Sequence, residues 1–345
     1  MASIELLDEL GQVVSGQNEV VIFTHNDPDP DAIASAVALR YLLDERFHVS
    51  TTITYRGHIG RAENKALVKY LKEPLKNLRN VNLERADKIA LVDTQPGAGN
   101  NALPLKYKAD IVIDHHPLRP DSQSAQFADI QLEIGATSTL LTSYLLAAGI
   151  EIPPEIATAL FFGIKTDTMG LSRNANPKDV QAYFHLQSLI DVNALVKIEQ
   201  AQVPMEYFQS IDSAIHACKL IDQDTVIVYM GALSYPDLGA ELADFFMRLI
   251  GVKWVLCMGV YREELILSIR SRSKRIGAGQ LITEIIAGKG SAGGHGSMAA
   301  GHIELDSENH ADRVAEDLGQ KLVLALKGTL DVPILPLIPE GDENC

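Results

Sequence analysis

Histidines and aspartates recur in the first half of the sequence at places where they could bind divalent cations. His25, Asp29 and Asp31 form an HxxxDxD arrangement within the segment THNDPDPDAIAS. Further along, Asp93 ends the apolar run KIALVD, and the triplet Asp114-His115-His116 closes the run ADIVIDHH. Oxygen and imidazole ligands of this kind suit manganese, magnesium or iron better than metals that prefer thiolates.

Each of these residues also has an ordinary structural explanation when it is taken alone. An aspartate before the helical run DAIASAVALRYLL can be an N-cap, a strand-end aspartate can form a turn, and a histidine pair can lie on the surface. Asp167, near the end of another apolar helix, could be a turn residue or one more ligand. A metal site is the interpretation that explains the whole set, because carboxylates gathered in one place repel each other unless cations neutralise them.

The elements that must position these side chains alternate between strand and helix. Apolar runs predict strands at EVVIFT, VSTTITY, KIALVD and ADIVID, and helical patterns follow the first two strands and recur over about 136–148 and 154–166. Such alternation predicts a largely parallel sheet with helices on both faces. Because the carboxyl ends of parallel strands meet at one edge of a sheet, Asp93 and Asp114 are expected to lie close together.

The second half of the sequence predicts a smaller α/β lobe with a mixed sheet. Strands are expected at TVIVYM, WVLCMGVY and ELILSIR, and the last two read as a hairpin around Arg262 and Glu263. The segment 288–301, GKGSAGGHGSMAAG, holds six glycines, which is too many for a regular element and suits close approach of the backbone to a ligand. The fold class is therefore α/β in two lobes. The expected boundaries are 1–190 for the first lobe, 191–205 for a helical linker, 206–335 for the second lobe and 336–345 for a tail.

Composition narrows the classes of partner. The formal net charge of -15 argues against binding to long duplex nucleic acid, which requires many basic contacts to phosphate. The three scattered cysteines indicate neither a disulfide framework nor a thiolate metal site. The N-terminus lacks a signal-peptide pattern, and no apolar run is long enough to cross a membrane. We expect a cytoplasmic protein without a membrane partner, and the sequence leaves open whether it forms a homodimer.

The order of these motifs resembles that of a known superfamily. The HxxxDxD segment, Asp93, the triplet at 114–116 and Asp167 resemble the four motifs of DHH phosphoesterases, which include RecJ, nanoRNases, cyclic dinucleotide phosphodiesterases and family II pyrophosphatases. The segment GGHGSMAAG, 293–301, resembles the glycine-rich motif of the DHH-associated domain. The resemblance implies a DHH catalytic domain over 1–190 and a DHH-associated substrate-binding domain over 206–335.

The resemblance also implies a pair of cation sites. The ligands it implies are His25, Asp29 and Asp93 for one cation and Asp31, His115 and Asp167 for the other, with Asp93 bridging the two. Manganese is the expected cation, with magnesium and cobalt as alternatives. In the same interpretation Asp114 orients an imidazole and His116 faces the phosphate, so that Asp93, Asp114 and His116 are the expected catalytic residues.

Substrate-binding residues are expected in the second lobe. The run RSRSKR, 270–275, can be a solvated cluster of charges when it is taken alone. The resemblance favours a phosphate clamp that consists of Arg270, Arg272, His295 and the backbone amides of Gly293 and Gly294.

These expectations describe a hydrolase of small phosphoesters that uses a water activated by two metal ions. The expected substrates are short oligoribonucleotides, cleaved in the 3'–5' manner of a nanoRNase, or nucleoside 3',5'-bisphosphates. Cyclic dinucleotides are the first alternative, and pyrophosphate or polyphosphate is the second. A nucleotide sensor without catalytic activity is a different class of function, and the presence of all six expected ligands argues against it.

Overall fold

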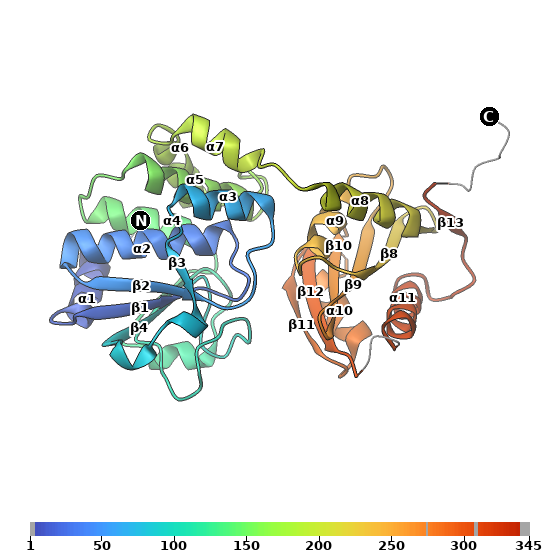
Figure 1. Cartoon of the computed structure of the whole chain (residues 1–345), viewed down its shortest axis with the longest axis horizontal. Helices are drawn as coiled ribbons and strands as arrows, with labels where there is room; N and C mark the ends of the chain where they lie inside the picture. Colours follow the sequence, from blue (N-terminus) through green and yellow to red (C-terminus); the bar gives the residue numbers. More distant parts are fainter. Residues whose placement is uncertain (1–3, 274, 307–309, 339–345) are drawn as a thin grey trace. The chain divides into compact units, whose positions relative to one another are not determined.

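The computed structural model describes residues 4–273, 275–306 and 310–338. The chain divides between Gln202 and Val203 into two compact units, which we call unit 1 (residues 1–202) and unit 2 (residues 203–345). In the colours of Figure 1, unit 1 runs from blue to yellow-green and unit 2 from yellow to red. Much of the expected linker, 191–205, is the helix α7 (Val192–Glu199), which is part of unit 1 and buries Leu195 and Ile198 in its core.

The sheet of unit 1 has six strands, and every pair of neighbours is parallel. Its order is β3-β2-β1-β4-β5-β6. The strands are β1 (Glu19–Phe23), β2 (Ser50–Tyr55), β3 (Leu75–Asn77), β4 (Lys88–Val92), β5 (Ile111–Asp114) and β6 (Phe127–Ile130). The central strands β1, β4 and β5 are buried on both faces, which explains why their sequences are continuous apolar runs.

The α-helices of unit 1 pack on one face of its sheet. They are α1 (Ile4–Val14), α2 (Pro30–Phe47), α3 (Ala62–Tyr70), α4 (Thr137–Ala147), α5 (Pro154–Asp167), α6 (Pro177–Gln187) and α7. Their buried side chains share one core with Val20 and Ile22 of β1, and Figure 1 shows α2 and α3 on the same side of β1 and β2.

Loops and short 3-10 helices cover the other face of this sheet. The alternating residues Val21 and Phe23 of β1 pack there with Leu91 of β4. The covering elements are η1 (Leu78–Asn80), η2 (Leu83–Arg85), the loop that joins β4 to β5, and Ala125, which directly follows η3 (Pro120–Ser124). The expectation of helices on both faces was therefore wrong for this face, because the connections from β3 to β4 and from β4 to β5 contain no α-helix.

Unit 2 contains a seven-stranded mixed sheet in the order β11-β12-β10-β9-β8-β7-β13. Among the strand pairs of unit 2 that the structure describes, only β8–β9 is parallel. The strands are β7 (Lys219–Ile221), β8 (Thr225–Ala232), β9 (Trp254–Tyr261), β10 (Glu264–Ser271), β11 (Ser291–His295), β12 (Met298–Glu304) and β13 (Ile334–Pro336). The predicted hairpin is β9–β10, and the α/β fold with a parallel first sheet and a mixed second sheet is confirmed.

Helices cover both faces of the sheet of unit 2. One face packs against α8 (Met205–Ala217) and α9 (Leu238–Phe246), and the other packs against α10 (Ala278–Ile286) and α11 (Ala311–Lys327). Of the tail expected over 336–345, residues 339–345 lie outside the described part of the chain.

The glycine-rich segment forms regular structure, contrary to the sequence-based expectation. Residues 291–295 of the segment form β11 and residues 298–301 begin β12, and the two strands pair in antiparallel register. The glycines allow this because a Cβ at Gly279 of α10 would overlap the carbonyl oxygen of Gly294, and a Cβ at Gly301 would overlap the side chain of Ile286. The absence of side chains therefore lets α10 lie directly against the hairpin.

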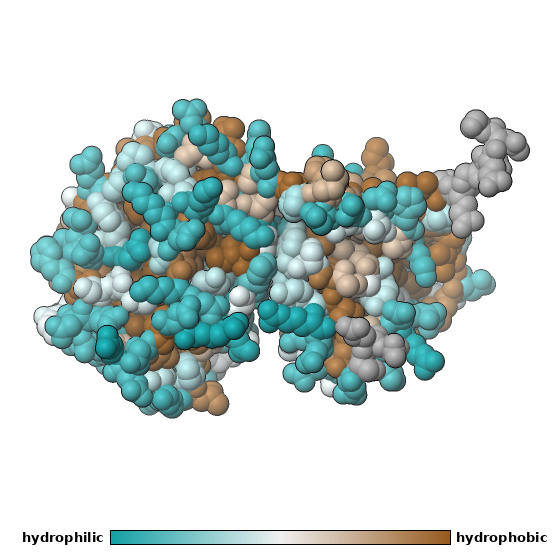
Figure 2. Space-filling view, in the orientation of Figure 1, coloured by the Kyte–Doolittle hydropathy of each residue, from teal (hydrophilic) through white to brown (hydrophobic). Residues whose placement is uncertain are grey.

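Hydrophilic side chains cover most of the visible surface of unit 1, with apolar residues scattered between them (Figure 2). Among the residues that the structure describes, none of the helices combines the length and the apolar composition that a membrane span requires.

Candidate metal centre

The carboxyl ends of β4 and β5 deliver the central residues of the candidate site. Asp114 is the last residue of β5, and Asp93 follows β4 directly. Asp93 has a φ of 57°, in the left-handed region that residues other than glycine rarely adopt, and its N–H donates to the carbonyl of Ile113 at 3.0 Å. This conformation turns the chain at the strand end and keeps the carboxylate at the sheet edge, where it is buried.

Helix ends supply three further carboxylates. Asp29 is the N-cap of α2, and its Oδ1 accepts a hydrogen bond from the N–H of Ala32 at 3.0 Å. Asp31 lies in the first turn of the same helix, and Asp167 is the last residue of α5. Asp29 therefore has both of the roles considered from the sequence, since it caps a helix and faces the candidate site.

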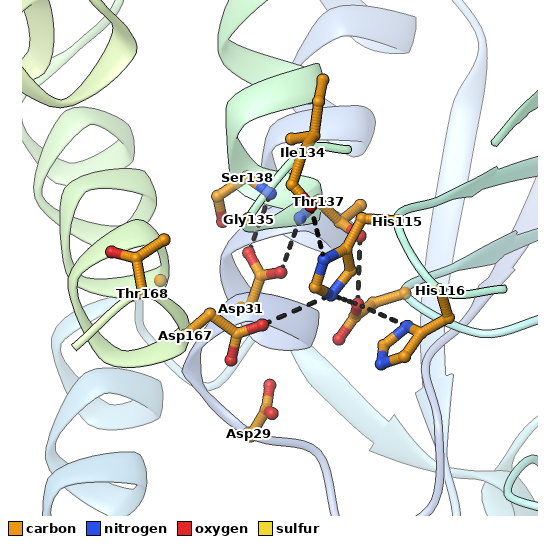
Figure 3. A network of polar contacts seen from close by, with 12 residues as sticks. Asp29, Asp31, His115, His116, Ile134, Gly135, Thr137, Ser138, Asp167 and Thr168 are labelled. Carbon is orange, nitrogen blue, oxygen red and sulfur yellow. Dashed lines mark hydrogen bonds and ion pairs between the residues drawn. The ribbon is translucent and has the colours of Figure 1, made fainter. Parts of the chain in front are cut away.

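The structure brings together all six expected metal ligands. Possible ligand atoms lie within 4.8 Å of one another in three groups, namely His25–Asp29–Asp93, Asp31–His115–Asp167 and Asp93–His115–His116. The first two groups have the same members as the two ligand sets that the family resemblance implied. Figure 3 shows the carboxylates of Asp31 and Asp167 and the imidazole of His115 turned toward one another.

His115 has the geometry of a metal ligand. Its Nδ1–H donates to the carbonyl of Ile134 at 3.1 Å, which leaves the lone pair on Nε2 when the ring is neutral. Nε2 lies 3.4 Å from Oδ1 of Asp93 and 3.3 Å from Oδ2 of Asp167, yet it is buried and makes no hydrogen bond of acceptable geometry. A lone pair that faces two carboxylates is repulsive unless a cation binds between them, so these residues fit a metal ion.

His25 repeats this arrangement on the other side of Asp93. Its Nδ1–H donates to the carbonyl of Asn26 at 2.7 Å. Its Nε2 lies 3.6 Å from Oδ1 of Asp29 and 3.5 Å from Oδ2 of Asp93. Asp93 thus presents one oxygen toward each histidine, which is the arrangement that a bridging carboxylate requires.

The pKa values of the cluster show how strongly its groups interact in the absence of a cation. Burial disfavours the charged form of His115, but the carboxylates of Asp167 and Asp93 outweigh burial and hold its pKa well above the ordinary value. Burial, with the negative charges of Asp93 and Asp167, raises the pKa of Asp31 far above that of an exposed carboxyl group. Protons bound to these groups therefore reduce the repulsion between the carboxylates when no metal ion is bound.

Helix α4 contributes contacts that the sequence did not predict. The backbone N–H groups of Thr137 and Ser138, in the first turn of α4, donate to the two oxygens of Asp31 at 2.7 and 2.8 Å (Figure 3). The hydroxyl of Thr137 donates to Oδ1 of Asp93 at 3.0 Å. The start of α4 therefore fixes the orientation of two candidate ligands.

Asp114 lies behind the histidine pair, as the expected orienting residue would. Its Oδ1 accepts hydrogen bonds from Nδ1 of His116 and from the backbone N–H of His115, both at 2.8 Å. Burial opposes the charged form of His116, but the hydrogen bond to Asp114 outweighs burial and raises the pKa of the imidazole. The side chain of His116 is 39% exposed, whereas that of Asp114 is buried.

The expected substrate-binding residues lie in unit 2. Arg270 of β10 forms an ion pair with Asp244 of α9, and Nη2 of Arg272 donates to the carbonyl of Met247 at 2.7 Å. Gly293 and Gly294 lie in the exposed part of β11. The side chain of His295 lies outside the described part of the structure. These arginines are held by α9 and the turn that follows it, contacts that no local pattern predicts.

Comparison with known proteins identifies the class of this chain. Residues 19–164 match the family described as DHH family, N-terminal domain. This region contains β1 to β6 and all the candidate ligands except Asp167. Residues 19–164 of unit 1 thus match the DHH family, as the motifs in this region predicted.

Two curated proteins and one solved structure illustrate this relationship. The chain is 34% identical over 287 residues to an uncharacterized protein of Methanocaldococcus jannaschii, covering 83% of this chain and 58% of that protein. It is 26% identical over 178 residues to a probable manganese-dependent inorganic pyrophosphatase of Streptococcus pyogenes, covering 51% of this chain and 57% of the relative. The chain thus spans somewhat more than half the length of these relatives. An exopolyphosphatase-related protein from Bacteroides fragilis shares the fold, with a TM-score of 0.72, 18% identity and coverage of 94% of this chain and 98% of that one.

Proposed function

We propose that this protein is a metal-dependent phosphoesterase with its catalytic centre in unit 1. The observation that carries the proposal is the pair of imidazole Nε2 atoms of His25 and His115, which lie 3.5 and 3.4 Å from opposite oxygens of the buried Asp93. The match of residues 19–164 to the DHH family supports the same reaction class.

Two divalent cations would fit this centre. His25, Asp29 and Asp93 would bind one, and Asp31, His115 and Asp167 would bind the other. Divalent cations bound in this way act as Lewis acids on a phosphoryl group and lower the pKa of a coordinated water. Manganese is the proposed metal, because the ligands are carboxylates and imidazoles and because one relative carries manganese in its name.

Other residues of unit 1 would prepare the centre for the reaction. Asp93 would fix the separation of the two sites, and Thr137 would hold its Oδ1 in place. His116, which is partly exposed and bonded to Asp114, would donate a hydrogen bond or a proton toward the phosphate of a bound substrate.

Short phosphorylated nucleotides are the proposed substrates, namely oligoribonucleotides of a few residues or nucleoside 3',5'-bisphosphates. The net charge of -15 disfavours long nucleic acid, while Arg270 and the open backbone of Gly293 and Gly294 in unit 2 would bind a terminal phosphate. Hydrolysis of inorganic pyrophosphate is the second candidate. It is favoured by the similarity, over 178 residues, to a probable pyrophosphatase.

A substrate panel tests these proposals. The protein is incubated with Mn²⁺ and, separately, with a short RNA, a nucleoside 3',5'-bisphosphate, a cyclic dinucleotide and pyrophosphate. We expect turnover of the short RNA or the bisphosphate, and we expect EDTA or Asp93→Asn to abolish it. Asp212→Asn is the matched control, because Asp212 is an exposed carboxylate in unit 2. Absence of turnover with every substrate would reject the phosphoesterase proposal.

The role of Arg270 is tested by comparing two variants of its ion pair. If Arg270 binds the substrate phosphate, Arg270→Gln should raise KM by about tenfold or more with little change in kcat. Asp244→Asn should leave KM unchanged or lower it, since it releases the guanidinium from its carboxylate partner. Equal loss of kcat and stability in both variants would show that the pair only stabilises unit 2.

A further inference from the structure

Gln95 is a buried glutamine whose amide group connects three parts of the chain around the candidate metal centre. It lies two residues after Asp93, and the residue is 1% exposed. Its Nε2 donates to Oδ2 of Asp114 at 2.6 Å and to the backbone carbonyls of His116 and Pro117, each at 3.2 Å. Such dense bonding of one buried amide fixes its position closely.

The other end of the same amide accepts hydrogen bonds from the segment that follows the histidine pair. Oε1 of Gln95 accepts from the N–H of Arg119 at 2.7 Å and from the hydroxyl of Ser122 at 2.9 Å. Asn101 in turn donates to the backbone carbonyl of Gln95 at 2.8 Å. The glutamine thus joins the loop after β4 to the loop after β5.

This network reaches the partly exposed histidine through one intermediate residue. Oδ2 of Asp114 is occupied by Gln95, so that Oδ1 is left to receive Nδ1 of His116 at 2.8 Å. Gln95 also binds the carbonyl of His116 itself. Gln95 therefore constrains the side chain of His116 through Asp114 and the backbone of His116 directly. In the contacts described, Gln95 touches none of the candidate metal-binding atoms.

We propose that Gln95 is a positioning residue that sets the orientation of the His116 imidazole through Asp114. The inference rests on the proposed function, in which His116 acts on the phosphate. An amide is suited to this task because it offers a donor to Asp114 and an acceptor to Arg119 at the same time. Glutamate cannot replace it, because a carboxylate oxygen would face Asp114 and two carbonyls without a proton to donate.

The first test observes the hydrogen bond directly and does not depend on activity. The ring nitrogens of the histidines are labelled with ¹⁵N, and the Nδ1–H resonance of His116 is assigned by its loss in His116→Ala. Spectra are recorded for the metal-free protein and with Mg²⁺, which is diamagnetic. In Gln95→Glu we expect this resonance to shift, and its exchange with water to become at least about tenfold faster. An unchanged resonance and exchange rate would overturn the proposal.

The second test is a double-mutant cycle on hydrolysis of whichever panel substrate is turned over. Gln95→Glu should lower kcat by about tenfold or more in the wild-type background. In the His116→Ala background the same change should alter kcat by less than about twofold, because the residue it positions is gone. Loss of the same factor in both backgrounds would show a structural role only. Gln95→Met is a second variant of similar length for use if the glutamate variant does not fold.

A control separates positioning from a general loss of buried hydrogen bonds. Tyr144→Phe removes a buried hydrogen bond to Asp129 elsewhere in unit 1, and it should leave the His116 resonance and kcat unchanged. If the wild-type protein hydrolyses nothing, the proposed function fails, and the NMR measurement alone then decides whether Gln95 orients His116.

Discussion

Asp31 and Ser138 are joined by a hydrogen bond of 2.8 Å from the backbone N–H of Ser138 to Oδ1 of Asp31. Asp31 is fully buried beside other carboxylates, where a negative charge is unfavourable. The N-terminus of α4 offsets part of this unfavourable energy. Its first N–H groups have no partner within the helix and can donate to an anion, and the helix dipole favours a negative charge at this end. The candidate metal centre therefore depends on a helix that contributes no predicted ligand of its own.

Divalent cations should stabilise the fold of unit 1. At a Mn²⁺ concentration one hundred times the dissociation constant, we expect the free energy of unfolding to rise by about 2.7 kcal/mol for each site. Thermal unfolding in EDTA and in Mn²⁺ measures this difference. Asp93→Asn should remove most of the increase, whereas Asp212→Asn, at an exposed position, should retain it. If Mn²⁺ raised the free energy of unfolding equally in both variants, the cations would bind at another site.

The affinity for cations should rise with pH. The carboxylates around His25 and His115 outweigh the effect of burial and hold both pKa values well above 6.5 in the metal-free protein, so a cation must displace protons to bind. Calorimetric titration with Mn²⁺ between about pH 6 and pH 8, in buffers of different ionisation enthalpy, should show proton release and an affinity that increases by up to about tenfold per pH unit for each proton released. A pH-independent affinity would contradict this prediction.

The stability of the metal-free protein should change with pH in the opposite direction. A histidine whose pKa is raised by folding stabilises the folded state fully below the ordinary value of 6.5, and this contribution is lost as the pH rises through the folded pKa. Thermal unfolding in EDTA should therefore show a falling midpoint from about pH 6.5 upward. A midpoint that rises over this range would be evidence against the ion pairs described for His25 and His115.

The hydroxyl of Thr137 should matter for cation binding although it is not a predicted ligand. Thr137→Val keeps the shape of the side chain and removes the hydrogen bond to Asp93. We expect the affinity for Mn²⁺ to fall by about tenfold. Thr142→Val is the matched control in α4, since the Thr142 hydroxyl donates to the carbonyl of Ser138. It should cost about 1 kcal/mol of stability without a change in affinity. Equal affinities in the two variants would count against the role of Thr137.

Gly279 should be intolerant of even the smallest side chain. Gly279→Ala places a methyl group against the carbonyl oxygen of Gly294, so α10 must move away from β11. We expect the free energy of unfolding of unit 2 to fall by about 1–3 kcal/mol. Gly293→Ala, next to Gly294 in β11, has no heavy atom within 4 Å of the added carbon. It should therefore change the free energy of unfolding much less. Urea titrations of both variants provide the comparison.

The strand ends and the ligand positions could be predicted from the sequence because each is marked by a local sequence pattern. Asp93 and Asp114 each close an apolar run, and parallel strands place such ends at one edge of the sheet. The HxxxDxD spacing placed Asp31 inside the first turn of α2. The structure brings these residues together with His115 and Asp167 in the arrangement that the family resemblance implied.

The supporting contacts were not accessible from the sequence, because their partners are distant in the chain. Nothing local marks Gln95 or Thr137 as neighbours of the histidine pair and of Asp93. The strand β11 was missed for a different reason. Glycine has a low intrinsic preference for strands, and the close packing of α10 on Gly294 overrides it.

The left-handed backbone of Asp93 limits how this position can be altered in the laboratory. A β-branched or bulky residue there would suffer steric strain from its own Cβ, whereas asparagine enters this region of conformational space with little penalty. Most members of a saturation library at codon 93 would therefore combine a folding defect with the missing ligand. Asparagine is the substitution that removes the charge while the main chain keeps its path, and inactive forms for trapping bound substrates should be built on it.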